Sequence, residues 1–207
     1  MSFGVSSHHR CGFLIKEKGG NHLKTTVLFL CCFLLNTHIV MIFYFSGTGN
    51  SKYIANLFSK KVNAKCYSIE ENIDFKKEIK RHNTIAFCYP IYASNVPRIM
   101  REFVSKYVEE LKDKKLIIFC TQLFFSGDGA RVFTDLLPKG YGEVIYAEHF
   151  NMPNNICNIK ILPIKNGEET KKYIKAAQRK MNRICKDLEK GKVKKIKTRT
   201  KKGRIRT

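Results

Sequence analysis

The chain has 207 residues, 43% of them apolar, which is enough to bury the core of one domain of ordinary size, with extra sequence at its ends. This composition excludes a wholly disordered chain. The formal net charge of +22 lies mostly near the C-terminus, where residues 160–207 hold 19 Lys and Arg against 4 Asp and Glu. Such a basic segment can contact nucleic acid or an anionic surface, or it can be a solvated end. We favour the second interpretation and expect a basic, disordered tail over residues 191–207.

The eight cysteines are not arranged for a disulfide framework or for an iron–sulfur cluster. No two of them are spaced C-x-x-C. Cys88 and Cys120 lie inside apolar runs and are expected in the core. A reducing, cytoplasmic location is therefore the expectation.

Residues 1–40 are predicted to lie outside the functional domain, which we place at residues 41–190. They can reflect an upstream start codon, with the domain itself beginning at Met41. An apolar run at residues 27–35 is shorter than the about 20 residues that a helix needs to cross a bilayer. A weak membrane anchor is the alternative interpretation, but we do not expect a membrane as a partner.

From residue 41 the sequence alternates between apolar segments typical of buried strands and segments with the period of an amphipathic helix. Strands are predicted at residues 41–45, 64–69, 84–89, 115–120 and 143–150. Helices are predicted at about residues 49–60, 75–80, 97–111, 128–137 and 168–189. This alternation predicts an α/β fold, with a doubly wound, five-stranded parallel sheet that helices cover on both faces.

The first predicted strand runs into a loop of small and hydroxyl residues, and a helix follows directly. The loop consists of Ser46, Gly47, Thr48, Gly49, Asn50 and Ser51. Backbone N–H groups in such a loop point at one place, and the N-terminus of the helix adds partial positive charge there. The loop has neither Walker A spacing nor the G-x-G-x-x-G pattern, so it suits a bound phosphate ester better than a nucleotide that is cleaved. An ordinary tight turn between strand and helix is the alternative interpretation.

Two later loops follow the third and fourth predicted strands. One contains Tyr89-Pro90-Ile91-Tyr92 and Pro97, and the other runs from Thr121-Gln122 to Ser126-Gly127-Asp128-Gly129-Ala130. Together with residues 46–51, these motifs resemble the flavodoxin family, and most of all the flavodoxin half of the flavodoxin–ferredoxin fusion proteins of anaerobic microbes. The resemblance covers roughly residues 41–190. The cysteine clusters of a ferredoxin half are absent from this sequence.

The resemblance implies the flavodoxin-like strand order 2-1-3-4-5 and FMN as the cofactor. In that order the ligand crevice lies at the carboxyl ends of strands 1 and 3. The three loops follow strands 1, 3 and 4 at this same edge, which supports the site independently of the family. The phosphate of FMN would rest on residues 46–51.

The flavin ring also needs apolar walls and polar contacts at its edge. Tyr92 and one of Phe124 and Phe125 are the candidate walls, with ordinary core or surface packing as the alternative. Asp128 is interpreted as the N-cap of the next helix in preference to a flavin contact, and Ser94 is one of two capping candidates for the preceding helix. The candidate cofactor contacts beyond the first loop are Pro90, Ile91, Tyr92, Ala93, Ser94, Thr121, Gln122, Phe124, Phe125, Gly127 and Asp128.

The sequence shows no acid–base pair and no nucleophile constellation, so the redox chemistry would belong to the flavin. An apolar wall disfavours the reduced, anionic flavin and predicts a low-potential one-electron carrier. The alternatives are a flavodoxin-like oxidoreductase acting on a quinone or a porphyrin precursor, and a basic nucleic-acid-binding protein that uses its C-terminal tail. That tail has no aromatic residue for base stacking, and we do not expect a nucleic acid as a partner.

The charge of the predicted domain indicates which redox partner to expect. Residues 41–159 hold 16 Lys and Arg against 12 Asp and Glu, whereas typical members of the resembled family are strongly acidic. An acidic partner, such as a ferredoxin-type iron–sulfur protein, is therefore the electrostatic expectation.

Overall fold

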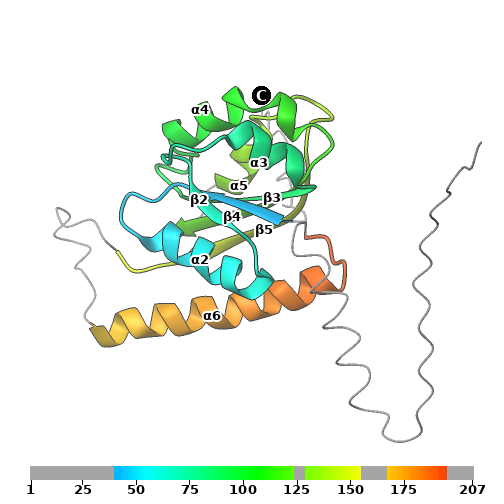
Figure 1. The fold of residues 1–207 in the computed structure, drawn as a ribbon. Coiled ribbons are helices and arrows are strands. Elements are labelled where there is room, and N and C mark those ends of the chain that lie inside the picture. Colours follow the sequence, from blue (N-terminus) through cyan, green and yellow to red (C-terminus); the bar gives the residue numbers. More distant parts are fainter. Residues whose placement is uncertain (1–39, 124–128, 155–166, 195–207) are drawn as a thin grey trace, which may run out of the picture. The chain divides into compact units, whose positions relative to one another are not determined.

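The computed structural model describes residues 40–123, 129–154 and 167–194, and over these residues the chain alternates between strands and helices (Figure 1). The strands are β1 (Val40–Tyr44), β2 (Cys66–Ser68), β3 (Thr84–Pro90), β4 (Lys115–Gln122) and β5 (Glu143–Asn151). All four neighbouring pairs are parallel, and the order in the sheet is β2-β1-β3-β4-β5. The predicted fold class and strand order are confirmed.

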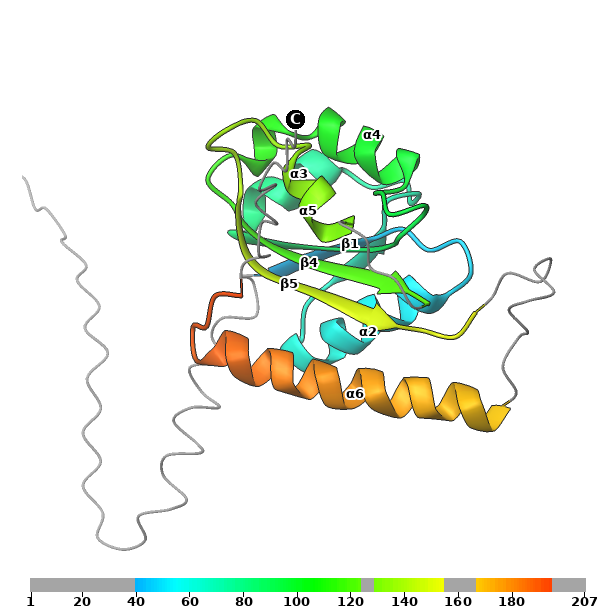
Figure 2. The same ribbon diagram turned by 180° about the vertical axis from the view of Figure 1, so that it is seen from behind.

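Helices cover both faces of the sheet. They are α2 (Asn50–Val62), α3 (Phe75–Arg81), α4 (Arg98–Lys106), α5 (Gly129–Thr134) and α6 (Gly167–Glu189). In both views α3, α4 and α5 lie on one face, while α2 and α6 lie on the other (Figures 1 and 2). Each parallel connection therefore crosses over one face of the sheet, as the βαβ pattern requires.

The helix predicted to extend from Pro97 to Leu111 is shorter in the structure. It ends at Lys106, and a separate 3-10 turn, η1 (Glu109–Leu111), follows. Leu111 remains buried, because the tighter turn returns it to the core side. The pattern of apolar residues alone could not predict this break, because every apolar position of the predicted helix is still buried or half-buried.

The start of α4 also differs from the prediction. Pro97 itself occupies the N-cap position, and no side chain caps the helix. Ser94 lies in a turn before the helix, and the Asn95 side chain accepts a hydrogen bond from the Val96 N–H at 2.8 Å. Neither residue is the cap that the sequence indicated.

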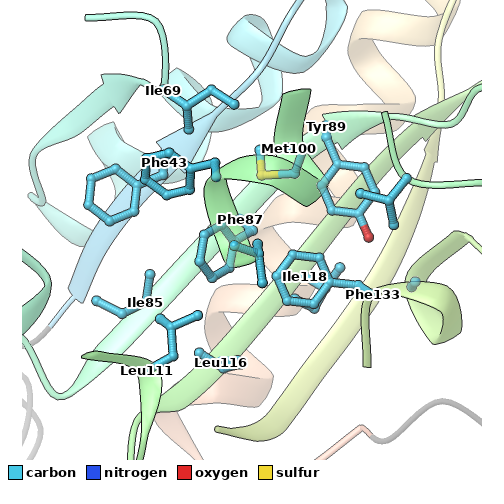
Figure 3. Close-up of a cluster of buried hydrophobic side chains, with 14 of the residues drawn as sticks. Phe43, Ile69, Ile85, Phe87, Tyr89, Met100, Leu111, Leu116, Ile118 and Phe133 are labelled. Carbon is cyan, nitrogen blue, oxygen red and sulfur yellow. The ribbon is translucent and has the colours of Figure 1, made fainter. Parts of the chain in front are cut away.

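The core consists of two apolar clusters, one on each face of the sheet. Beneath α3, α4 and α5, Phe43, Phe87 and Tyr89 of the central strands lie in one apolar cluster (Figure 3). Phe43 lies 5.6 Å from Phe103 of α4 between ring centroids. Beneath α2 and α6, Phe58 and Phe119 meet edge to face at 5.0 Å. Burying each such side chain contributes roughly 1.5–3 kcal/mol, so both faces hold the strand ends in fixed positions.

The chain beyond α6 continues along the free edge of β5. The Lys194 N–H donates to the Ile145 carbonyl at 2.9 Å, and the Ala147 N–H donates to the Lys194 carbonyl at 3.2 Å. The tail was predicted to begin at residue 191, whereas residues 191–194 follow α6 onto this edge. Residues 195–207 lie outside the described residues.

A buried carboxylate reinforces this edge. Glu148 of β5 is 8% exposed, and Lys194 Nζ lies 2.5 Å from its Oε2. Lys180 and Arg183 of α6 each place a charged nitrogen 3.5 Å from the same carboxylate. Burial alone would raise the pKa of Glu148, but the hydrogen bond from Lys194 and the charges of Lys180 and Lys194 outweigh it, and the pKa is lowered.

Candidate functional site

The three predicted loops begin at neighbouring strand ends. Tyr44, the last residue of β1, pairs with Cys88 of β3, and Pro90 at the end of β3 pairs with Thr121 of β4. Because the strands are parallel, the segments that follow them emerge at one edge of the sheet. The sequence-predicted loops are therefore brought together in space.

The first loop is closed by its own side chain and leads into α2. The Ser46 hydroxyl accepts a hydrogen bond from the Gly49 N–H at 3.1 Å. Gly49 has φ of +93° and occupies the N-cap position of α2 without a side-chain cap. The first N–H groups of α2 therefore have no side-chain acceptor at the cap, and this is the arrangement that binds a phosphate group.

Gly47 and Tyr92 connect the first loop to the second. A Cβ atom built on Gly47 would lie 3.0 Å from the Tyr92 hydroxyl oxygen. A larger residue at position 47 would therefore push against this tyrosine. Glycine at position 47 permits the close approach of the two loops. The next residue, Thr48, is exposed to solvent.

Ser51 and Thr121 face each other instead of facing solvent. Their hydroxyl oxygens lie 2.7 Å apart, and the two residues are 1% and 3% exposed. The Ser51 carbonyl also accepts from the Cys88 thiol at 3.2 Å. Both residues were predicted as cofactor contacts, and the structure places their side chains in a link between α2 and β4.

Asn50 is similarly engaged with another part of the chain. Its side-chain amide donates to the Pro153 carbonyl at 3.0 Å, which ties the start of α2 to the segment after β5. The Met152 N–H in turn donates to the Gln122 carbonyl at 2.8 Å. The strand ends of β4 and β5 and the start of α2 are therefore connected by hydrogen bonds.

The second loop is a tight turn. Tyr92 and Asn95 exchange two backbone hydrogen bonds, of 3.1 and 2.9 Å, across Ala93 and Ser94. Ala93 has φ of +47° and Ser94 has φ of +62°. These are left-handed conformations, which cost free energy for any residue with a Cβ atom. Such strain is common where a backbone contacts a ligand.

Tyr92 is a large apolar side chain that the fold leaves half exposed, at 50%. The Ile91 N–H, just before it, donates to the Thr121 carbonyl at 2.9 Å, so the root of the loop is fixed to β4. The fixed root and the exposed ring agree with the predicted role of Tyr92 as a wall beside a flat ligand. Pro90 lies at the end of β3 as predicted.

The third loop is described only in part. Gln122 donates from its side-chain amide to the Asn151 side chain at 2.9 Å, and its buried Oε1 has no hydrogen-bond partner in the part of the chain that the structure describes. The loop ends at Gly129, whose carbonyl accepts from the Tyr89 hydroxyl at 3.1 Å. A Cβ atom on Gly129 would lie 2.6 Å from the Ile91 side chain, so a larger residue would require Ile91 to shift. Four predicted contacts fall outside the described residues: Phe124, Phe125, Gly127 and Asp128.

The rim of the site carries basic residues and no acidic ones within the described parts of the three loops. Lys52 and Arg101 are exposed beside the first and second loops, and Arg98 is paired with Glu102 at 2.6 Å. No group of metal-ligating side chains occurs among the described residues. The described loops also lack histidine, so their side chains offer no proton donor or acceptor with a pKa near neutrality.

The buried thiols beneath the site are protonated at neutral pH. Desolvation raises the pKa of Cys120 to about 12 and raises that of Cys88 well above its ordinary value. Thiols with such pKa values are poor nucleophiles. Cys88 and Cys120 therefore serve as core residues, as their apolar runs predicted.

Three residues that shape this edge were not singled out from the sequence as site residues. Asn95 closes the second loop, Asn151 holds the Gln122 side chain, and Tyr89 anchors Gly129. Asn151 could have been found, since it ends the strand next to β4 and parallel strand ends meet at one edge. The other two contacts depend on a turn geometry and a side-chain direction that the residue pattern does not specify.

One cavity reaches this edge at Asn151. It has a volume of about 430 Å³ and is lined by the end of β5 and the first half of α6, including Phe150, Tyr173 and Ala176. None of the three loops contributes to its lining.

Within the described ranges, no helix has the length and apolar character needed to span a membrane.

The match to a family model decides the relationship to known proteins. A model described as "Flavodoxin domain" matches residues 41–195. The chain belongs to the flavodoxin domain family. The match includes all three loops of the site. No curated protein matches the sequence at a significant level.

Solved structures share the fold of this flavodoxin-family chain at low sequence identity. The Trp repressor binding protein from Bacillus subtilis is 11% identical, with a TM-score of 0.50, covering 68% of this chain and 96% of its own. Two-electron reduced Megasphaera elsdenii flavodoxin is 22% identical (TM-score 0.48; 68% and 99% covered). Fusobacterium nucleatum flavodoxin bound to flavin mononucleotide is 19% identical (TM-score 0.46; 72% and 98% covered). At this identity the likeness concerns the fold alone.

Proposed function

We propose that this flavodoxin-family chain binds FMN at the carboxyl edge of β1, β3 and β4 and serves as an electron-transfer protein. The observation that carries the proposal is the convergence of an uncapped helix N-terminus, a half-exposed tyrosine and a strained turn at one sheet edge. A phosphate site and a flat aromatic wall are the two features that a flavin mononucleotide needs. The family match places the same three loops inside the flavodoxin domain.

The residues present fit the phosphate of FMN. The loop from Ser46 to Gly49 carries no acidic side chain, and the first turn of α2 has none either. An anion placed there gains hydrogen bonds from backbone N–H groups and the favourable end of the helix dipole. The hydroxyl of Thr48 and the N–H groups of Asn50 and Ser51 are the groups that would hold it.

The flavin, when bound, supplies the redox chemistry, and the protein holds and orients it. Tyr92 would cover one side of the ring, and the backbone of residues 91–95 would contact its edge. The buried Gln122 Oε1, which has no hydrogen-bond partner among the described residues, is an acceptor for an N–H group that a ligand brings. Because the described loops lack acid–base side chains, the site favours electron transfer over acid–base chemistry on a substrate.

We further propose an acidic redox protein, such as a ferredoxin, as the partner. Lys52 and Arg101 stand exposed at the rim, and no Asp or Glu occurs in residues 45–52 or 90–101. Opposite charges on the two surfaces would steer the encounter and orient the partner.

A comparison of FMN with riboflavin tests the phosphate site directly, because riboflavin has the same ring and no phosphate. Quenching of flavin fluorescence measures both affinities on the protein without bound flavin. We expect FMN to bind at least about 100-fold more tightly, which corresponds to two charge-assisted hydrogen bonds. Thr48→Val should weaken FMN binding and leave riboflavin binding unchanged, and equal affinities for the two ligands would refute the phosphate site.

Stopped-flow reduction of the FMN-loaded protein by an acidic ferredoxin tests the electron-transfer role. The second-order rate should fall as ionic strength rises, because screening removes the attraction between the two surfaces. Replacing both Lys52 and Arg101 by Gln should flatten that dependence. A fast turnover of quinones with a rate independent of ferredoxin would instead favour the oxidoreductase alternative.

A further inference from the structure

The outward face of α6 carries a row of basic side chains along its whole length. All of its members are exposed. We call this set the basic row: Lys172, Lys175, Arg179, Arg183, Lys186 and Lys190. Lys190 follows the last residue of α6, and its N–H still donates to the Lys186 carbonyl at 3.3 Å, so it continues the helical turn.

Helical geometry aligns these residues. With 3.6 residues per turn, their positions fall within an arc of about 80°, and the row is about 27 Å long. The buried residues of α6, Ala177, Met181 and Ile184, lie on the opposite side of the helix and pack in the apolar cluster beneath it. Figure 2 shows α6 running along this face of the sheet. The basic row therefore lies on the side of α6 away from the core, from which Arg183 reaches the buried Glu148 at 3.5 Å.

Most of the basic row has no acidic partner. Within the described chain, Arg183 shares Glu148, but no ion pair involves Lys172, Lys175, Arg179, Lys186 or Lys190. Of the acidic residues of α6, Glu168 falls within the arc at its N-terminal end and pairs with Lys171 at 2.6 Å, whereas Glu169, Asp187 and Glu189 lie outside the arc. Like charges three or four residues apart destabilise a helix, whereas opposite charges at the same spacing stabilise it. A helix whose outer face only contacts water would therefore be more stable with pairs of opposite charge. This segregation indicates an anionic partner.

We propose that the basic row binds the phosphate backbone of a nucleic acid without reading its sequence. A straight row of cations complements a polymer that carries regularly spaced phosphates along its length. The sequence continues with seven Lys and Arg and no acidic residue over residues 195–207, so the positive charge extends beyond α6.

A lipid surface fits the basic row less well. Val193 and Tyr92 are the large apolar side chains that the described residues leave exposed, and neither belongs to the basic row. A helix that binds a membrane surface normally inserts apolar side chains beside its charges. The apolar face of α6 is already used in the core.

Fluorescence anisotropy with a labelled 30-base-pair duplex of mixed sequence tests the proposal on the full chain. Binding at 50 mM NaCl should weaken about 10³-fold at 200 mM NaCl, as expected for about six phosphate contacts. The variant Lys172→Gln, Arg179→Gln, Lys186→Gln should lower the slope of log K against log salt by about 3, since each contact contributes about 0.9. A second duplex of different sequence should bind equally.

The matched control removes the same charge elsewhere. Lys77, Lys115 and Lys139 are exposed, lie on other elements and have no ion pair in the described chain. Their replacement by Gln should leave the slope unchanged, and circular dichroism would verify that both triple variants are folded. Equal slopes for the two triple variants would overturn the proposal. So would displacement of the duplex by phosphatidylserine vesicles or polyglutamate at a lower charge concentration than by unlabelled duplex.

Discussion

The hydroxyl oxygens of Ser51 and Thr121 lie 2.7 Å apart, and this buried contact joins the start of α2 to the end of β4. Two of the three loops of the proposed FMN site therefore share one internal hydrogen bond. Because the contact lies beneath the site, it positions the loops without occupying the space for a ligand.

We predict that Ser51 and Thr121 are energetically coupled. Ser51→Ala or Thr121→Val leaves one buried hydroxyl without a partner and should lower the free energy of unfolding by about 1–2 kcal/mol. The double variant should cost little more than either single variant, with a coupling energy of about 1 kcal/mol. Urea unfolding of the four proteins measures this, and additive losses would show that the contact is absent in solution.

Gly47 and Tyr92 offer a second test, in which one substitution repairs another. Gly47→Ala places a methyl group 3.0 Å from the Tyr92 hydroxyl and should displace the ring, which would weaken FMN binding several-fold. Tyr92→Phe removes the contacting oxygen and should restore part of that affinity in the double variant. A titration with FMN measures both effects, and an unchanged affinity for Gly47→Ala would contradict the close approach of the two loops.

Glu148 should make the stability of the protein sensitive to acid. Its pKa is lowered in the folded state, so its contribution is present above its ordinary value of 4.5 and is lost as pH falls through the lower, folded value. At pH 7, Glu148→Gln should lower the free energy of unfolding by about 2 kcal/mol, because three cations lose their shared carboxylate. This difference should be constant from about pH 5 to pH 7 and shrink below about pH 4.5.

The control for this prediction is Glu102→Gln. Glu102 pairs with Arg98 at 2.6 Å, but the two side chains are 60% and 84% exposed. Such a surface pair contributes at most about 0.5–1 kcal/mol. If the two variants lost stability equally at pH 7, the buried cluster around Glu148 would have no special role at the edge of β5.

The buried thiols should resist alkylation in the folded protein. Cys88 and Cys120 are both fully buried, and desolvation keeps the pKa of Cys120 at about 12. Iodoacetamide at pH 8, followed by peptide mass spectrometry, should label neither residue in buffer and both in 6 M urea. Rapid labelling in buffer would show that the central strands open easily.

The sequence predicted the architecture well because its signals are local and repeated. The apolar run Ile85–Tyr89 reflects a strand that is buried on both faces of the sheet. The helical period of α6 reflects a helix that is buried on one side. The end of α4 at Lys106 was missed because a 3-10 turn keeps Leu111 buried, so the apolar pattern is the same with or without a break.

The convergence of the three loops was predicted correctly, but not the directions of their side chains. The loops follow strands whose ends must meet in a parallel sheet, so their convergence could be foreseen. Whether the Ser51 hydroxyl faces a ligand or Thr121 depends on the rotation of α2 against the sheet, which residue types do not determine. The contact between Asn50 and Pro153 is separated by 103 positions and has no local signal.

Titration of the flavin-free protein with FMN, followed by visible absorption and flavin fluorescence, tests the central claim most directly. The account predicts saturation at one FMN per chain, with a perturbed flavin spectrum and a clear preference for FMN over riboflavin. A folded protein that is colourless as purified and leaves added FMN free in solution would contradict it.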